Sequence, residues 1–157
     1  MKIGIVGSRR RNSYFDNSVV MSIVKKAIDR YGSQNITVVS GGCPKGADFF
    51  AEKAADALGL QKLIFPVERK DFPDKYSFVR EAFARNLKIA ENSDIVFALV
   101  HSDRTGGTEN TVSHCLNIVT PVILVDDDGR LYIPRGWCGD QISYEEAFEQ
   151  ADKGRAA

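Results

Sequence analysis

The sequence predicts an α/β domain in which a mainly parallel, five-stranded sheet is covered by helices on both faces. Short runs of branched apolar residues, bounded by turn-forming residues, are typical of strands buried on both sides. They alternate with longer stretches whose apolar residues recur every three or four positions, as on a helix with one buried side. Strict alternation of strands and helices implies right-handed crossovers and therefore parallel pairing.

The first half of the chain holds three predicted strands and two predicted helices. Residues 2–6, 36–40 and 62–66 are short apolar segments that predict strands. Between them, residues 19–28 carry a helical apolar stripe that ends before Gly32, and residues 47–58 carry a second stripe that ends at Gly59. Glycine directly after a helix is a common stop signal because it adopts left-handed backbone conformations without strain.

The second half continues the alternation. After a loop that contains Pro73, the spacing predicts a helix whose inner face is formed by Val79, Ala82, Phe83, Leu87 and Ala90. Residues 94–100 are the fourth and most apolar strand, and residues 121–125 are the fifth. The helix between them is expected to turn inward the residues Val112, Cys115, Leu116 and Val119.

Residues 126–157 are expected to extend this core of residues 1–125. Residues 126–129 predict a turn, residues 130–133 are compatible with a short additional strand, and residues 143–153 predict a last helix. The chain shows no internal repeat, low-complexity region or linker. We therefore expect residues 1–157 to form a single Rossmann-like domain, a three-layer sandwich of helices around the sheet.

Composition excludes several classes of protein. The formal net charge is zero, with 21 Lys and Arg against 21 Asp and Glu, which argues against holding nucleic acid through the overall field. Cys43, Cys115 and Cys138 lack metal-like spacing and fit a reducing compartment better than a disulfide framework. No apolar run reaches membrane-spanning length, and the chain opens directly on a strand rather than on a signal peptide. A cytoplasmic location without a membrane partner, metal site or cofactor is the expectation.

Three glycine-containing loops follow predicted strands and mark the candidate site. The first strand leads into Gly7-Ser8-Arg9, the second into residues 40–48, and the fourth into residues 103–110. In an open parallel sheet, ligands bind beyond the carboxyl ends of the strands. Glycine lets a ligand approach the backbone, and each loop leads to a helix N-terminus whose free N–H groups favour an anion. Three such loops at one edge predict a site for a phosphorylated ligand.

These loops match neither of the two common phosphate-binding fingerprints. The second loop lacks the Gly-Lys-Ser/Thr ending of a Walker A motif, and the first lacks the glycine spacing of the dinucleotide GxGxxG motif. An ordinary P-loop NTPase and a standard NAD dehydrogenase are therefore disfavoured.

Taken together, the loops resemble the SLOG superfamily, and within it the small YspA-like branch. The resemblance covers roughly residues 1–125 and is carried by Gly7-Ser8-Arg9, by Ser40-Gly41-Gly42 with Gly46-Ala47-Asp48, by Arg85-Asn86 and by Gly106-Gly107-Thr108 with Thr111. It implies a Rossmann-like sheet that binds a nucleotide or nucleotide derivative, as a sensor or as an enzyme. Relatives include the LOG phosphoribohydrolases, the DNA-processing protein A recombination mediators and ligand-sensing domains of defence proteins.

The resemblance also assigns candidate ligand-binding residues. Either glycine loop, the one with Gly41, Gly42 and Gly46 or the one with Gly106, Gly107 and Thr108, could hold a phosphate, and Thr108 could equally cap its helix. Of the run Arg9-Arg10-Arg11, Arg9 is expected to point into the site while the other two are solvated. Ser8, Lys45 and Arg104 are candidates for polar or electrostatic contacts, with a turn-stabilising or surface role as the alternative.

Two neighbouring residues on the predicted third helix belong to the candidate site. Asn86 falls on the apolar stripe, so its amide should face inward and be hydrogen-bonded, because leaving it unpaired costs about 1–3 kcal/mol. Arg85 is expected to reach a phosphate with its planar fork, the alternative being a surface ion pair with Glu81. Asp48 lies in the first turn of its helix, where it either interacts with the helix dipole or accepts a hydrogen bond from the ligand.

Arg85 and Glu109 are the candidate catalytic pair if the chain cleaves a nucleotide. LOG enzymes rely on a glutamate three residues after the threonine of their glycine loop, but that position is Thr111 here and Glu109 directly follows Thr108. One residue turns a side chain by about 100° around a helix, so Glu109 does not simply inherit the role.

Three functions remain open after this reading. The first is binding of a nucleotide-like small molecule, and the second is hydrolysis of the N-glycosidic bond of a nucleoside monophosphate. The third, binding of single-stranded DNA, is disfavoured because no basic, aromatic-rich stretch is evident. Some SLOG relatives form dimers, which leaves a homodimer open.

Overall fold

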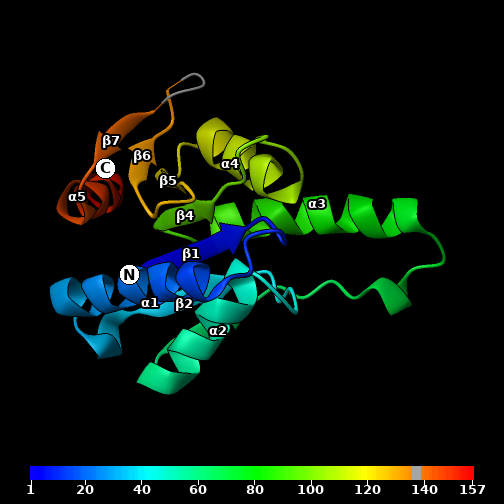
Figure 1. Ribbon diagram of the computed structural model, residues 1–157, viewed down its shortest axis with the longest axis horizontal. Coiled ribbons are helices and arrows are strands. Elements are labelled where there is room, and N and C mark those ends of the chain that lie inside the picture. Colours follow the sequence, from blue (N-terminus) through cyan, green and yellow to red (C-terminus); the bar gives the residue numbers. More distant parts are fainter. Residues whose placement is uncertain (136–138) are drawn as a thin grey trace.

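The computed structural model describes residues 1–135 and 139–157, and within them seven strands form one sheet. The strand order is β3-β2-β1-β4-β5-β6-β7 (Figure 1). In chain order the strands are β1 (Lys2–Gly7), β2 (Thr37–Ser40), β3 (Gln61–Ile64), β4 (Ile95–Leu99), β5 (Val122–Val125), β6 (Leu131–Ile133) and β7 (Asp140–Ile142). The first five pair in parallel, which confirms the predicted α/β, Rossmann-like fold with a mainly parallel sheet.

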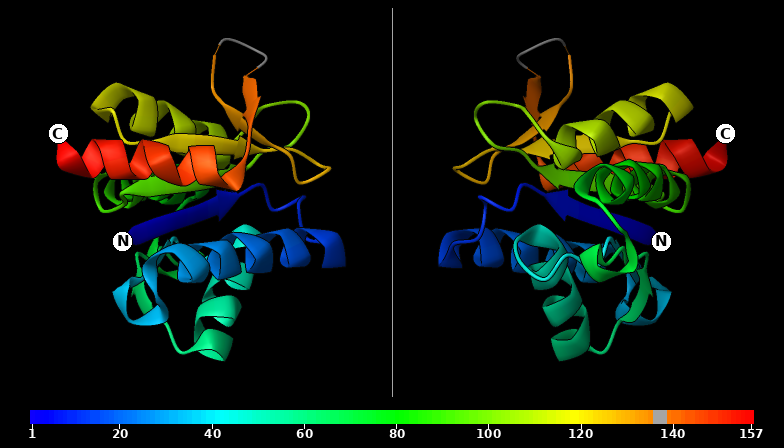
Figure 2. Two further views of the ribbon diagram at one scale, coloured as in Figure 1. Left: turned by 90° about the vertical axis from the view of Figure 1, so that its left-hand side faces the viewer. Right: turned by 90° about the vertical axis from the view of Figure 1, so that its right-hand side faces the viewer.

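The chain after β5 differs from the rest of the sheet. The strand compatible with residues 130–133 forms as β6, antiparallel to β5, and β7 then pairs antiparallel with β6. The sequence did not predict β7. Both side views of Figure 2 place β6 and β7 at one edge of the molecule and α2 (Ala47–Leu58) at the other, as the strand order requires. Trp137 and Cys138, together with residue 136, lie outside the described residues.

Helices pack on both faces of the sheet and divide the core into two clusters. On one face lie α1 (Tyr14–Tyr31), α2 and α5 (Tyr144–Ala156), and on the other lie α3 (Lys75–Glu91) and α4 (Gly107–Ile118). Strand β4 is buried on both faces: its odd-numbered residues Ile95, Phe97 and Leu99 join the first cluster, and Val96 and Ala98 join the second. This is the two-sided burial that its continuous apolar run predicts.

Three residues predicted to face the core are exposed instead. Leu116, within α4, is 53% exposed. Val119 is 85% exposed because α4 ends at Ile118 and Val119 already has left-handed backbone angles. Phe83 on α3 is 40% exposed. The N-terminal half of α3 runs past the carboxyl end of β1 (Figure 1), so its apolar side has no sheet beneath it. Helical spacing alone does not show which turns of a helix extend past the strands and therefore leave their apolar side exposed.

The order of the strands locates the switch point where a ligand is expected. Strand β1 lies between β2 and β4, and the chain leaves β1 toward one edge of the sheet and returns to β4 on the other side. In doubly wound sheets the loops that follow two such strands part and leave a crevice between them. The loops after β1 and β4 therefore frame the candidate site. In the part of the chain that the structure describes, no helix combines the length and apolarity that crossing a bilayer would need.

Candidate functional site

A cavity of about 550 Å³ lies at this switch point, beyond the carboxyl ends of β1 and β4. Its volume is within the range of small-molecule sites. Segments far apart in the sequence line it, namely the β1–α1 loop, the starts of α2 and α4, and one side of α3. The predicted site residues among its lining are Gly7, Ser8, Arg9, Asp48, Arg85, Asn86, Gly106, Gly107 and Thr108. The predicted site residues outside it are Gly41, Gly42, Lys45, Gly46, Arg104 and Glu109.

The loop after β1 brings two arginines to the cavity. Arg9 and Arg10 both line it. Arg10 makes a two-pronged ion pair with Asp103 of the β4–α4 loop, at 2.6 and 2.8 Å, so that it ties together the two loops of the switch point. The Ser8 hydroxyl accepts a hydrogen bond from the backbone N–H of Arg10 at 3.3 Å. Arg10 is exposed, as expected, but it is also held in this ion pair, which the sequence did not predict.

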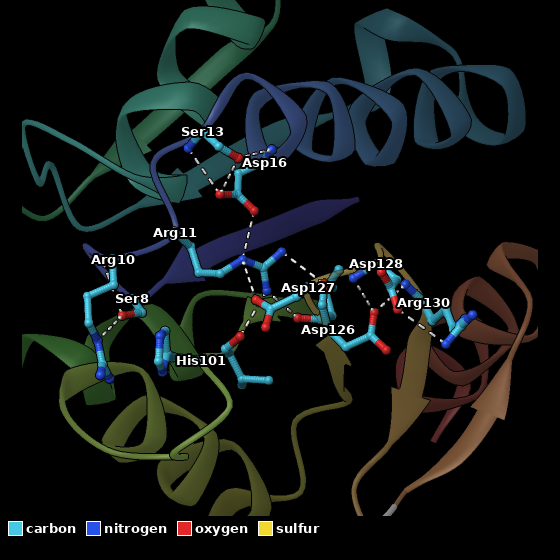
Figure 3. A network of polar contacts seen from close by, with 12 residues as sticks. Ser8, Arg10, Arg11, Ser13, Asp16, His101, Asp126, Asp127, Asp128 and Arg130 are labelled. Atoms are coloured by element: carbon cyan, nitrogen blue, oxygen red, sulfur yellow. Dashed lines mark hydrogen bonds and ion pairs between the residues drawn. The ribbon is translucent and has the colours of Figure 1, made fainter.

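Arg11, also expected to be solvated, is the most buried of the three arginines, at 3% exposure. Its guanidinium lies against the carboxyl ends of β4 and β5 (Figure 3), where it donates to the carbonyls of Val100 at 2.8 Å and Val125 at 2.9 Å. It also pairs with Asp16 at 2.7 Å, whose other oxygen accepts from the cap residue Ser13. Arg11 donates to carbonyl groups at the ends of two strands and thereby fixes the loop that carries Arg9 and Arg10.

The glycines after β2 lie outside the lining of the cavity but make room for residues that line it. A Cβ atom on Gly41 would lie 2.5 Å from Arg85 Nη1, so only glycine leaves room for the guanidinium. Gly42 and Gly46 have positive φ angles of 70° and 79°, which glycine adopts without strain. Lys45 is exposed on this loop. This loop supports Arg85 and contributes Cys43 and Asp48 to the cavity, but its glycines do not line the hollow.

Arg85 and Asn86 project from α3 into the site. Arg85 Nη1 donates to the carbonyls of Gly41 and of Phe65, the latter at 3.0 Å, and its Nε donates to Asn86 Oδ1 at 3.2 Å. The Asn86 amide donates to the Gly107 carbonyl at 3.2 Å, so it ties α3 to the start of α4. The inward, hydrogen-bonded amide is confirmed. In the described residues Arg85 Nη2 has no hydrogen-bond partner, which leaves it available to a ligand.

Asp48 supplies the only carboxylate among the described residues that line the cavity. It is 8% exposed, and its Oδ2 accepts from the Cys43 backbone N–H at 3.3 Å. Burial raises the pKa of Asp48 to about 6, although the Arg85 guanidinium opposes this shift. A carboxyl that exchanges its proton near neutral pH inside a cavity is suited to proton transfer or to sensing the charge of a ligand.

The start of α4 presents unsatisfied backbone donors. Gly106, the residue before the helix, has a φ angle of 92°, and no side chain caps this end. The backbone N–H groups of Gly107 and Thr108 have no hydrogen-bond partner in residues 1–135 and 139–157. Both residues line the cavity. An uncapped helix start that faces a hollow favours an anion, through its free donors and its dipole.

Glu109 and Arg104 form a pair away from the cavity. Arg104 Nη2 lies 2.9 Å from Glu109 Oε2, and Arg104 lines a separate cavity of about 360 Å³ next to Asp126 and Tyr132. Glu109 and Arg104 lie outside the lining of the larger cavity, whereas Thr108 is part of it. The rotation of about 100° per residue accounts for this, because successive helix residues face different sides.

Sequence reasoning missed four residues that line the cavity on the far side from β1. Arg69 lies in a short 3-10 helix (Arg69–Asp71), and Lys75 is the first residue of α3. Phe78 and Val79 follow on the same side. The signal for these residues was the amphipathic pattern of α3. The first turns of this helix extend past the carboxyl end of β1 (Figure 1), so their apolar residues do not pack on a strand.

Other ligand chemistries have less support from the side chains present. Within the described residues, no group of three His, Cys, Asp or Glu side chains is arranged to hold a metal ion. Cys43 and Cys115 are free thiols. In comparisons of the sequence with known proteins, no family model and no curated protein matched significantly.

Proposed function

We propose that this chain binds a phosphorylated, nucleotide-like ligand in the cavity between the loops that follow β1 and β4. The charge of the lining carries this proposal. Five basic side chains face the hollow, Arg9, Arg10, Arg69, Lys75 and Arg85, against the one carboxylate of Asp48 in the described lining. Such a concentration of one charge attracts ligands of the opposite charge, and guanidinium groups suit phosphate oxygens in particular.

The phosphate end of the ligand is proposed to lie where the uncapped start of α4 and Arg85 converge. Asn86 links these two elements, since it accepts from Arg85 Nε and donates to the Gly107 carbonyl. Free N–H groups of Gly107 and Thr108 and the free Nη2 of Arg85 can then donate to the same phosphate. Of the two glycine loops open from the sequence, this favours the one that precedes α4.

An apolar wall supports the nucleotide-like part of the proposal. Phe78, Val79, Ala82 and Phe83 of α3 line the same cavity. Aromatic and aliphatic side chains next to cations fit a ligand that combines a flat, weakly polar ring with phosphate. Membership of the SLOG superfamily remains part of the proposal, and it is supported by the convergence of the Gly7, Arg85 and Gly106 motifs on one cavity.

Hydrolysis through Glu109 is not part of the proposal, because Glu109 pairs with Arg104 outside the lining. If the site does cleave a nucleotide, Asp48 is the better placed carboxyl. A raised pKa lets a carboxyl hold a proton that it can give to a leaving group.

Calorimetric titration with AMP, adenosine and inorganic phosphate tests the binding proposal. Arg85→Ala should weaken AMP binding roughly 10- to 100-fold, the loss expected for a charge-assisted hydrogen bond. Arg80→Ala is the matched control, because Arg80 is exposed on the same helix and does not line the cavity. Absence of AMP binding, or equal loss in both variants, would contradict the proposal.

A further inference from the structure

The cavity continues along α3 to a second group of cations, well away from the phosphate site proposed above. Lys75 and Arg85 lie ten residues apart on α3, and both line the cavity. With a rise of 1.5 Å per residue, their backbones are separated by about 15 Å along the helix axis. Arg69 joins Lys75 at the far end. Figure 1 shows this N-terminal half of α3 extending past the tip of β1.

The far cations form no ion pair in the described residues, although Asp74 lies near Arg69: the pKa of Asp74 is lowered first by hydrogen bonds from Ser77 and also by the Arg69 guanidinium. Within the described residues, neither Lys75 nor Arg69 takes part in an ion pair, whereas the neighbouring Lys70 pairs with Glu68 at 2.7 Å. Arg69 Nη1 donates to the Phe72 carbonyl at 2.7 Å, which holds its side chain against the segment that leads into α3. Two unpaired positive groups therefore remain at this end of the cavity.

An apolar strip joins the two cationic ends. Phe78 and Ala82, and likewise Val79 and Phe83, are four residues apart, so each pair lies on one side of the helix. All four line the cavity, between Lys75 at one end and Arg85 at the other. Phe72 packs against Phe78, with ring centroids 6.1 Å apart, and gives the strip a firm edge. The order along the cavity is thus cation, apolar surface, cation.

From this order we propose that the ligand is a nucleotide with phosphoryl groups at two separated positions and at least one nucleoside between them. The inference rests on the proposed function and narrows its ligand class. Both cationic ends carry long, flexible side chains, so the two anionic groups need be no farther apart than the 15 Å between backbones. A nucleoside monophosphate would occupy only the half of the cavity at α4.

The test compares ligands whose charge is distributed differently. AMP has one anionic end, ATP gathers its charge at one end, and the 5′-phosphorylated dinucleotide pApA carries phosphates on either side of a base. The dinucleotide should bind roughly tenfold or more tightly than AMP, because it adds a charged contact at the far end. If total charge governed affinity, ATP would instead bind the tightest of the three.

Variants at the far end complete the test. The double variant Arg69→Ala, Lys75→Ala should remove the advantage of pApA by weakening pApA binding far more than AMP binding, and Lys70→Ala should change neither. Equal affinity for pApA and AMP, or an equal loss for both in the double variant, would overturn this inference while the proposed function stands. Failure of AMP, ATP and pApA alike to bind would overturn both.

Discussion

Replacing Asp48 by asparagine should stabilise the protein at neutral pH and change its stability little near pH 4. The folded-state pKa of Asp48 is raised from 3.8 to about 6, first by burial and against the opposing effect of Arg85. Between these two values the unfolded chain has lost the proton while the folded chain keeps it. Because the folded state then binds more protons, wild-type stability falls as the pH rises through this window.

The size of the effect follows from the shift. One pKa unit corresponds to about 1.4 kcal/mol, so a shift of roughly two units lowers the free energy of unfolding by about 3 kcal/mol once the pH is above 6. Asparagine has no charge to desolvate, and its side-chain oxygen can still accept from the Cys43 backbone N–H. The stability difference between Asp48→Asn and wild type should therefore grow by about 2–3 kcal/mol between about pH 4.5 and 7.5.

Urea unfolding at several pH values, followed by circular dichroism, measures this difference. Asp74→Asn is the control. Asp74 caps α3, and a hydrogen bond from the Ser77 backbone N–H at 2.8 Å lowers its pKa. Its stabilising contribution is lost only as the pH falls below about 4, so the difference between Asp74→Asn and wild type should stay constant over the measured range. A pH-independent difference for Asp48→Asn as well would refute the view that Asp48 is desolvated.

Four further substitutions test other parts of the site and fold. Arg11→Met should lower the free energy of unfolding in urea by about 3–5 kcal/mol, because it leaves a buried carboxylate without its ion-pair partner. Arg10→Ala removes only a half-exposed ion pair, so it should lower the free energy of unfolding by less than about 1 kcal/mol. Gly41→Ala should displace Arg85 and weaken AMP binding in calorimetry; unchanged affinity would contradict the role of Gly41. Val119→Gly should raise stability by about 1 kcal/mol, visible as a higher melting temperature, because Val119 is exposed at a φ of 63°.

Local patterns were sufficient to predict the core of the fold. Strands β1 to β5 are short and apolar, and each is separated from the next by a helical stripe, so the chain itself specifies their parallel pairing, although not their order in the sheet. Strand β7 has no such signal. Asp140 and Gln141 are polar and exposed, and the strand exists only because β6 offers it a free edge. A strand that forms through pairing with a neighbour, and not through burial of its own side chains, has no apolar pattern by which the sequence could predict it.

For the site, residues whose roles depend on local backbone geometry could be predicted, and those that depend on distant contacts could not. Gly7, Gly106 and Thr108 follow strands and precede or begin helices, which places them at the sheet edge. Arg11 gives no local sign of burial, because besides Asp16 its partners include carbonyl groups 89 and 114 residues away in the chain. Glu109 differs, because its partner Arg104 is only five residues away and its rotation of about 100° from Thr108 follows from the helix pattern.

The zero net charge of the chain conceals an uneven distribution that bears on what the cavity is for. Arg10 is the one cation of the described lining that has an ion-pair partner, Asp103. Arg9, Arg69, Lys75 and Arg85 line one hollow and form no ion pair in the described residues, where Asp48 is the only acid of the lining. Burial and the nearby Arg9 lower the pKa of Arg85, so its charge is unfavourable in the empty cavity, and an anion bound beside it would remove that cost. An arrangement that is unfavourable alone and favourable with a polyanion is what a binding site, rather than a structural core, requires.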